Sequence, residues 1–136
     1  DGTIIAVGHL MSVALEAALA AETAGVSVHV WDPRSLLPLD RDGLISAVKR
    51  TGRVVILDDS NRTCGYGGEL AATLAELCFQ CLQAPIRRLT RADIPIPFSP
   101  PLEEAALVTT DRVVRTVLDL ASWSESTAKG IGVAHA

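Results

Sequence analysis

The chain has 136 residues and is 49% hydrophobic, which is enough for one domain with a substantial core. Its formal net charge of −4 argues against a nucleic-acid partner, because such a partner needs a clustered basic face. Even the apolar residues 11–21 contain Ser12 and Glu16, so no window supplies the roughly 18 uninterrupted apolar residues of a membrane span.

Strand and helix patterns alternate along the first 90 residues. Short β-branched or apolar runs at 3–7, 26–31, 54–57 and 86–90 predict strands. Apolar residues at helical spacing predict helices over 11–24, over a segment capped by Asp40 and ended by Gly52, and over 69–82. This alternation is typical of right-handed β-α-β units, and the apolar third strand fits a sheet covered on both faces. We therefore predict a three-layer α/β/α domain with a mostly parallel sheet.

A proline-rich segment, residues 88–104, follows the fourth strand. Its prolines fix φ and lack a backbone donor, so we expect a stiff, extended connector that cannot lie inside a helix. They are Pro95, Pro97, Pro100 and Pro101. A last helix is predicted over 110–121, which closes the domain at residue 121. Residues 122–136 lack periodicity, and we expect a weakly ordered tail from which Trp123 packs back on the domain.

The cysteines Cys64, Cys78 and Cys81 give no reason to expect a disulfide framework and favour a reducing, intracellular compartment. A redox C-x-x-C begins a helix and is exposed, whereas Cys78 and Cys81 fall late in an apolar helix, so we interpret both as core residues. They also fall short of the four ligands of a zinc site. Residues 1–8 enter a strand pattern without a basic stretch, so we expect no targeting signal in this chain.

The loop GYGGE, residues 65–69, places glycines directly before a helix, where free amides and the helix dipole favour an anion. It is neither G-x-G-x-x-G nor a P-loop. We favour the interpretation that the glycines allow close backbone approach, with Glu69 in the first helical turn; phosphate binding is the alternative.

A candidate crevice involves His9, Asp58 and Asp59, which follow or end the first and third predicted strands. Ligands of open α/β sheets bind beyond the carboxyl ends of the strands, and a histidine beside a carboxylate there is suited to acid-base chemistry. Helix capping or an interface role is the interpretation that we favour. None of the histidines His9, His29 and His135 belongs to a recognisable triad. We assign no catalytic, cofactor-binding or metal-binding residue.

Asp93, Glu103 and Glu104 are acidic residues in or beside the proline-rich segment. Their default interpretation is solvated or helix-start charge. The sharper hypothesis is partner binding, because a proline-ordered segment loses little entropy when it docks.

The order of motifs resembles the C-terminal domain of the β subunit of thiamine-diphosphate-dependent 2-oxoacid dehydrogenases, of the pyruvate, 2-oxoisovalerate or acetoin type. The resemblance covers about residues 3–121 and is carried by TIIAVGHLMSVALEAA, DPRSLLPLD, VVILDD, GYGGELAATLAE and APIRRLTRADIPIPFSPPLEE. It implies a transketolase C-terminal domain fold with parallel strand order 2-1-3-4. In this family an additional antiparallel edge strand usually precedes the segment that starts here.

The resemblance also implies a function. The complete enzyme decarboxylates a 2-oxoacid and transfers the acyl group to lipoamide, with thiamine diphosphate and Mg²⁺ bound by other domains. No G-D-G motif followed by Asn is found in this chain, so we expect it to bind no cofactor and to be inactive alone. Implied partners are the E1 α subunit, a second β subunit and the basic subunit-binding domain of the E2 acyltransferase. The implied location is the bacterial cytoplasm or the mitochondrial matrix.

Two alternatives stay open at this stage. One is the equivalent domain of a transketolase or deoxyxylulose-phosphate synthase. The other is a free-standing regulatory domain that binds a small ligand near His9 and Asp59. The sequence does not reveal which 2-oxoacid is used.

Overall fold

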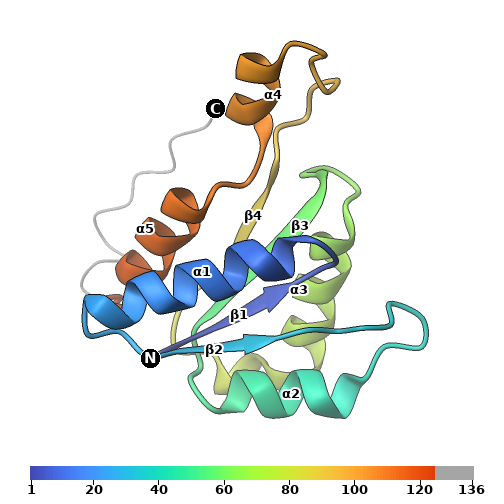
Figure 1. The fold of residues 1–136 in the computed structure, drawn as a ribbon. Coiled ribbons are helices and arrows are strands. Elements are labelled where there is room, and N and C mark those ends of the chain that lie inside the picture. Colours follow the sequence, from blue (N-terminus) through green and yellow to red (C-terminus); the bar gives the residue numbers. More distant parts are fainter. Residues whose placement is uncertain (125–136) are drawn as a thin grey trace.

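The structure, a computed structural model that describes residues 1–124, contains one four-stranded sheet with helices on both faces (Figure 1). The strands are β1 (Gly2–Ala6), β2 (Val28–Trp31), β3 (Val54–Asn61) and β4 (Arg87–Arg91). All three pairings are parallel, and the strand order is β2-β1-β3-β4. The predicted fold class and strand order are therefore confirmed.

The helices alternate with the strands as the periodicity predicts. They are α1 (Leu10–Thr23), α2 (Arg41–Lys49), α3 (Tyr66–Cys78), a 3-10 turn η1 (Phe79–Cys81), α4 (Pro100–Ala106) and α5 (Thr110–Ala121). Helices α1 and α5 cover one face of the sheet, and α2 and α3 cover the other (Figure 1). The domain thus has three layers.

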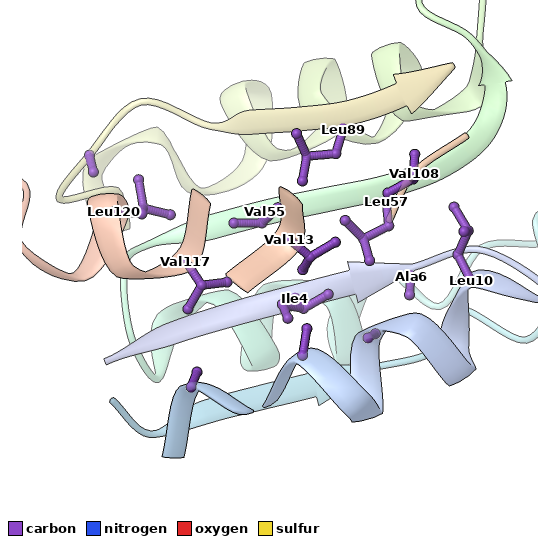
Figure 2. Close-up of a cluster of buried hydrophobic side chains, with 14 residues drawn as sticks. Ile4, Ala6, Leu10, Val55, Leu57, Leu89, Val108, Val113, Val117 and Leu120 are labelled. Carbon is purple, nitrogen blue, oxygen red and sulfur yellow. The ribbon is translucent and has the colours of Figure 1, made fainter. Parts of the chain in front are cut away.

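Two hydrophobic clusters lie on the two faces of the sheet. Figure 2 shows the first, in which Ile4, Val55 and Leu57 of the sheet meet Val113 and other residues of α1 and α5. The second joins Ile5, Val54 and Ile56 to buried side chains of α2 and α3. Neighbouring residues of β1 and β3 point to opposite faces, so both central strands contribute to both clusters. This explains why residues 4–6 of β1 and 54–57 of β3 are all apolar.

The end of the proline-rich segment departs from the prediction. Pro100 and Pro101 begin helix α4, so the expectation of an extended connector without a helix was wrong for these two residues. The first turn of a helix has no intrahelical use for its N–H groups, and it accepts proline for that reason. Residues 92–99 form no helix or strand, in agreement with the rest of the expectation.

The boundaries of one strand and one helix also differ from the prediction. Strand β3 continues to Asn61 instead of ending at residue 57, because it stays paired with β4 through an irregularity between Asp58 and Asn61. Helix α3 begins at Tyr66 and ends at Cys78, which leaves Cys81 in the 3-10 turn. Trp123 packs against the first cluster as expected. The rest of the predicted tail, residues 125–136, lies outside the described residues.

Candidate functional site

The carboxyl ends of the parallel strands form one edge of the sheet, where α/β folds bind ligands. The chain leaves β1 toward β2 on one side and returns to β3 on the other, so the ends of β1 and β3 flank a topological switch point. His9 follows β1, and Asp58 and Asp59 lie in β3. The predicted crevice is therefore at the position that the fold favours for a ligand.

His9 and Asp59 come together at this point. The His9 Nδ1 atom lies 3.7 Å from Asp59 Oδ2, and the Arg91 Nε atom lies 3.4 Å from Asp59 Oδ1. Both distances are long for a hydrogen bond with good geometry, and the imidazole of His9 is largely exposed. The arrangement is a loose Asp59–Arg91 ion pair at the end of the sheet with His9 beside it, and it is not a tightly oriented acid-base pair.

Sequence reasoning missed Arg91 as a member of this ion pair. It is the last residue of β4, and β4 lies beside β3 in the sheet. The signal was present in the predicted strand order 2-1-3-4, because residues that end neighbouring parallel strands meet at the same edge. Its side chain is mostly buried, and its Nε atom has no hydrogen-bond partner.

Asp58 points to the opposite face of the sheet from Asp59, as alternation along a strand requires. It is buried, and its Oδ2 atom accepts hydrogen bonds from the Gly67 N–H at 2.6 Å and the Ser60 hydroxyl at 2.5 Å. A carboxylate at this position satisfies a free amide of helix α3 and complements its dipole. Asp58 therefore acts as a structural cap for α3.

The same contact decides between the two interpretations of the GYGGE loop. A Cβ atom on Gly65 would overlap the Ser60 hydroxyl and the Asn61 carbonyl oxygen, and one on Gly67 would lie 3.2 Å from the Asp58 Cβ atom. The glycines thus allow β3 and α3 to approach closely. The anion at the start of α3 is the protein's own carboxylate, so these residues do not fit the diphosphate of a cofactor.

The C-x-x-C pair is split between a buried and a half-buried residue. Cys78 is buried in the second cluster, while Cys81 packs against that cluster from η1. Burial raises the pKa of the Cys78 thiol, and the neighbouring Cys81 adds to the effect. A thiol with a raised pKa is a poor nucleophile. Among residues 1–124, no group of three or more His, Cys, Asp or Glu side chains is arranged to hold a metal ion.

The segment between β4 and α5, residues 92–107, forms an arm that extends beyond the end of the sheet and carries α4 (Figure 1). Asp93 fastens its base: the Asp93 carboxylate accepts hydrogen bonds from the Thr63 N–H at 2.9 Å and the Thr63 hydroxyl at 2.7 Å. These bonds hold the pKa of Asp93 below its ordinary value of 3.8. Both carboxylate oxygens of Asp93 are thus engaged within the chain.

The rest of the arm presents apolar and acidic side chains to solvent. Glu103 and Glu104 are exposed on α4. The Phe98 side chain is fully exposed, and three more large apolar residues of the arm are at least 47% exposed: Ile94, Ile96 and Leu102. Isolated apolar residues on a surface are ordinary, but four within nine residues form a patch of the kind found at protein interfaces.

Comparison with known proteins gives a consistent result. The sequence profile of the family described as "Transketolase, C-terminal domain" matches residues 1–113. The acetoin:2,6-dichlorophenolindophenol oxidoreductase subunit beta of Bacillus subtilis is 42% identical over 120 residues, which are 88% of this chain and 35% of that protein. The 2-oxoisovalerate dehydrogenase subunit beta of the same organism is 36% identical over 90% of this chain and 38% of its own length.

A eukaryotic relative and a solved structure extend the comparison. The mitochondrial pyruvate dehydrogenase E1 component subunit beta of Dictyostelium discoideum is 33% identical over 84% of this chain and 32% of that protein. A solved structure described as "Split gene transketolase, inactive beta4 tetramer" has a TM-score of 0.75 and 31% identity over 90% of this chain and 38% of its own. The chain spans about a third of the length of these relatives. No helix within residues 1–124 is both long and apolar enough to cross a bilayer.

Proposed function

Since this chain belongs to the transketolase C-terminal domain family, we propose that it is the C-terminal domain of the β subunit of a thiamine-diphosphate-dependent 2-oxoacid or acetoin dehydrogenase. In this proposal the chain contributes to assembly and partner docking, while other parts of the enzyme carry out the chemistry. When the substrate is a 2-oxoacid, the complete enzyme decarboxylates it and passes the acyl group to lipoamide; acetoin has no carboxyl group, so its carbon–carbon bond is cleaved without decarboxylation.

The arm is the observation that carries the assembly role. Phe98 is fully exposed within the described part of the chain, and Ile94, Ile96 and Leu102 are 47 to 60% exposed, so burying their exposed surface against another subunit would be favourable. We assign the apolar part of the arm to contact with another E1 subunit, either α or a second β. The solved relative is described as a β4 tetramer, which supports contacts between β subunits.

The acidic residues of α4 support a second contact. Glu103 and Glu104 are exposed and adjacent to the apolar patch, so they are available to a basic partner. The basic subunit-binding domain of the E2 acyltransferase is such a partner, and charge complementarity would speed its association and fix its orientation. Asp93 contributes to this surface indirectly, because it fixes the base of the arm through Thr63.

Thiamine diphosphate and Mg²⁺ belong to the proposed complete enzyme. The described residues do not fit these groups: Asp58 already occupies the amide at the start of α3, and no cluster of metal ligands is present among residues 1–124. We therefore derive no catalytic step for this chain and expect it to be inactive when isolated.

The likeness to a split-gene transketolase favours a second candidate. A transketolase assembled from two gene products also uses a separate β subunit, and its donor is a sugar phosphate instead of a 2-oxoacid. The two candidates share the same fold and the same assembly role. They differ in the substrate of the assembled enzyme.

Reconstitution tests the proposal and separates the candidates. The complete β subunit is co-expressed with the α subunit encoded beside it, and decarboxylation of 2-oxoacids or oxidation of acetoin is assayed with thiamine diphosphate and Mg²⁺. We expect turnover by the assembly and none by the 136-residue chain alone. Ketol transfer from a sugar phosphate would favour the transketolase. Tight binding of thiamine diphosphate by the isolated chain, measured by calorimetry, would contradict both.

A further inference from the structure

A groove lined by arginines runs along the outer side of β4. It does not include His9 or Asp59, and the proposed assembly role does not use it. Its volume is about 380 Å³, and Arg62, Arg87, Arg88 and Arg112 line it, together with Asp119 at α5. Because β4 is an edge strand, side chains from both faces of the sheet meet there. The chain as a whole carries a net charge of −4, so this concentration of positive charge is local.

These arginines form no close salt bridges. Within residues 1–124, the guanidinium groups of Arg62, Arg87, Arg88 and Arg112 form no ion pair with a carboxylate within 4.0 Å, although Arg34 and Arg91 each have one. Asp119 lines the groove but pairs with none of them at this distance. Four cations share one hollow with the Asp119 carboxylate, and Asp93 interacts with Arg62. Positive charge is still in excess, so the guanidinium groups repel one another and an oxyanion would relieve this repulsion.

The guanidinium groups make long contacts within the chain that leave most of their N–H donors free. Arg62 Nη1 donates to the Arg88 carbonyl oxygen at 3.4 Å, and Arg88 Nη1 donates to the Arg62 carbonyl oxygen at 3.5 Å. Arg112 Nη1 donates to the Thr90 carbonyl oxygen at 3.3 Å, and Arg87 lies over the Trp123 ring at 5.3 Å. Each guanidinium has five donors and these contacts use at most one of them, so every group still has capacity for a ligand.

The same contacts favour a small ligand over an added peptide strand. A peptide that pairs with an edge strand needs the strand's outward carbonyl oxygens. On β4, Arg62 and Arg112 already cover the carbonyl oxygens of Arg88 and Thr90. The volume of the groove falls within the range of small-molecule sites, at about 300 to 1,000 Å³.

We propose that this groove binds a small multivalent oxyanion, such as a phosphorylated metabolite, between β4 and α5. Planar guanidinium groups bind phosphate oxygens in pairs, and two or more phosphate oxygens would be needed to engage arginines from both sides of the strand edge. Binding at this site would be independent of the thiamine-diphosphate centre that the proposed function assigns to other domains. Failure of the test below therefore leaves the assembly role untouched.

The test measures binding of inorganic pyrophosphate to the 136-residue chain by isothermal titration calorimetry at constant ionic strength. The variant Arg62→Gln/Arg88→Gln is expected to bind at least about tenfold more weakly, as loss of two charge-assisted contacts implies. Arg41→Gln/Arg115→Gln is the matched control: it also removes two positive charges, both from exposed arginines outside the groove, and its affinity should stay within about twofold. Asp119→Asn should bind more tightly, because it removes the one carboxylate at the groove.

Three further measurements keep the outcome decisive. If the double variant loses its circular dichroism spectrum, the single exposed variant Arg112→Gln replaces it and should weaken binding by several-fold. Equal affinities for the wild-type chain and the groove variants would overturn the proposal, as would pyrophosphate binding no more tightly than chloride. A hepta-glutamate peptide that binds this groove more tightly than pyrophosphate would also overturn it, because the site would then serve an acidic protein segment.

Discussion

At the scale of single residues, two aspartates fix the segment that leads from β3 into α3. Asp58 is buried and accepts from Gly67 and Ser60, so it ties β3 to the start of α3. Asp93 accepts from Thr63 and ties the same segment to the base of the arm. Both carboxylates act through backbone N–H groups and hydroxyls of the chain. Asp58 and Asp93 differ in role from Asp59 at the crevice because of where they lie in the fold, since all three residues are aspartates.

The Asp93 contact makes a prediction about pH. The pKa of Asp93 is lowered by the Thr63 N–H first and by the Thr63 hydroxyl second. Because the pKa is lower in the folded chain, the contribution of the contact is present above the ordinary value of 3.8 and is lost as the pH falls through the folded value. Urea midpoints of the wild-type chain and Asp93→Asn should therefore differ above pH 3.8 and converge below it.

Thr63→Val provides the matched variant for this experiment. It keeps the backbone N–H and removes the hydroxyl, so the pKa of Asp93, followed by NMR of the carboxyl carbon, should rise toward 3.8. The urea midpoints of the wild-type chain and Asp93→Asn could instead differ by the same amount above and below pH 3.8. That result would show that the carboxylate does not contribute through these bonds.

At the scale of elements, the start of α3 depends on close approach to β3. A side chain on Gly65 would overlap the Asn61 carbonyl oxygen, which belongs to the backbone and cannot move away. Gly65→Ala should therefore lower the free energy of unfolding by about 1 to 3 kcal/mol, measured by urea denaturation. Gly68→Ala is the control, since its nearest neighbour is the flexible end of Arg88 at 3.2 Å and alanine favours the helix. An equal loss in both variants would contradict this account.

Helix α3 also gives a direct test of its register against the sheet. Leu74 is fully buried in the second cluster, whereas Leu77 on the same helix is 43% exposed. Leu74→Ala should cost about 2 to 5 kcal/mol of unfolding free energy through lost burial and the cavity left behind. Leu77→Ala should stay within about 0.5 kcal/mol. Similar losses for the two variants, measured by urea denaturation, would mean that the helix is rotated from its position here.

The elements also show which features a sequence can predict. The four strands, their parallel order and the buried face of α3 follow from apolar spacing and motif order, because burial requires that spacing. The division between Asp58 and Asp59 requires the exact strand extension, since one residue of shift exchanges the faces. Helix α4 was missed because its prolines were treated as excluded from helices, although the first turn tolerates them. Arg91 was missed although the predicted order places β4 beside β3, because its pairing with Asp59 also depends on where the two strands end, and β3 extends beyond its predicted end.

At the scale of the whole molecule, one sheet supports two hydrophobic clusters. Ile4 and Leu57 face the first cluster, and Ile5 and Ile56 face the second. Detachment of either layer of helices from the sheet would expose the apolar side chains of the central strands to water. We therefore expect the domain to unfold as one unit. The arm contributes little to these clusters. Its large apolar residues at 94, 96, 98 and 102 are all exposed. The proposed function therefore places assembly in a different part of the molecule from the hydrophobic clusters that stabilise the fold.

This division can be tested with the two phenylalanines of the chain, Phe79 and Phe98. Both are exposed, Phe79 at 71% in η1 before β4 and Phe98 fully in the arm after it. Phe98→Glu should change the unfolding free energy of the 136-residue chain by less than about 0.5 kcal/mol, because the ring buries nothing within the described residues. In the complete β subunit it should abolish association with the other subunits, seen by analytical ultracentrifugation, because a charge would be buried at the contact.

The control variant Phe79→Glu should leave both the unfolding free energy and the association unchanged. Intact association of the Phe98→Glu protein would remove the arm from the interface, and a large loss of stability in the isolated chain would mean that the arm belongs to the core.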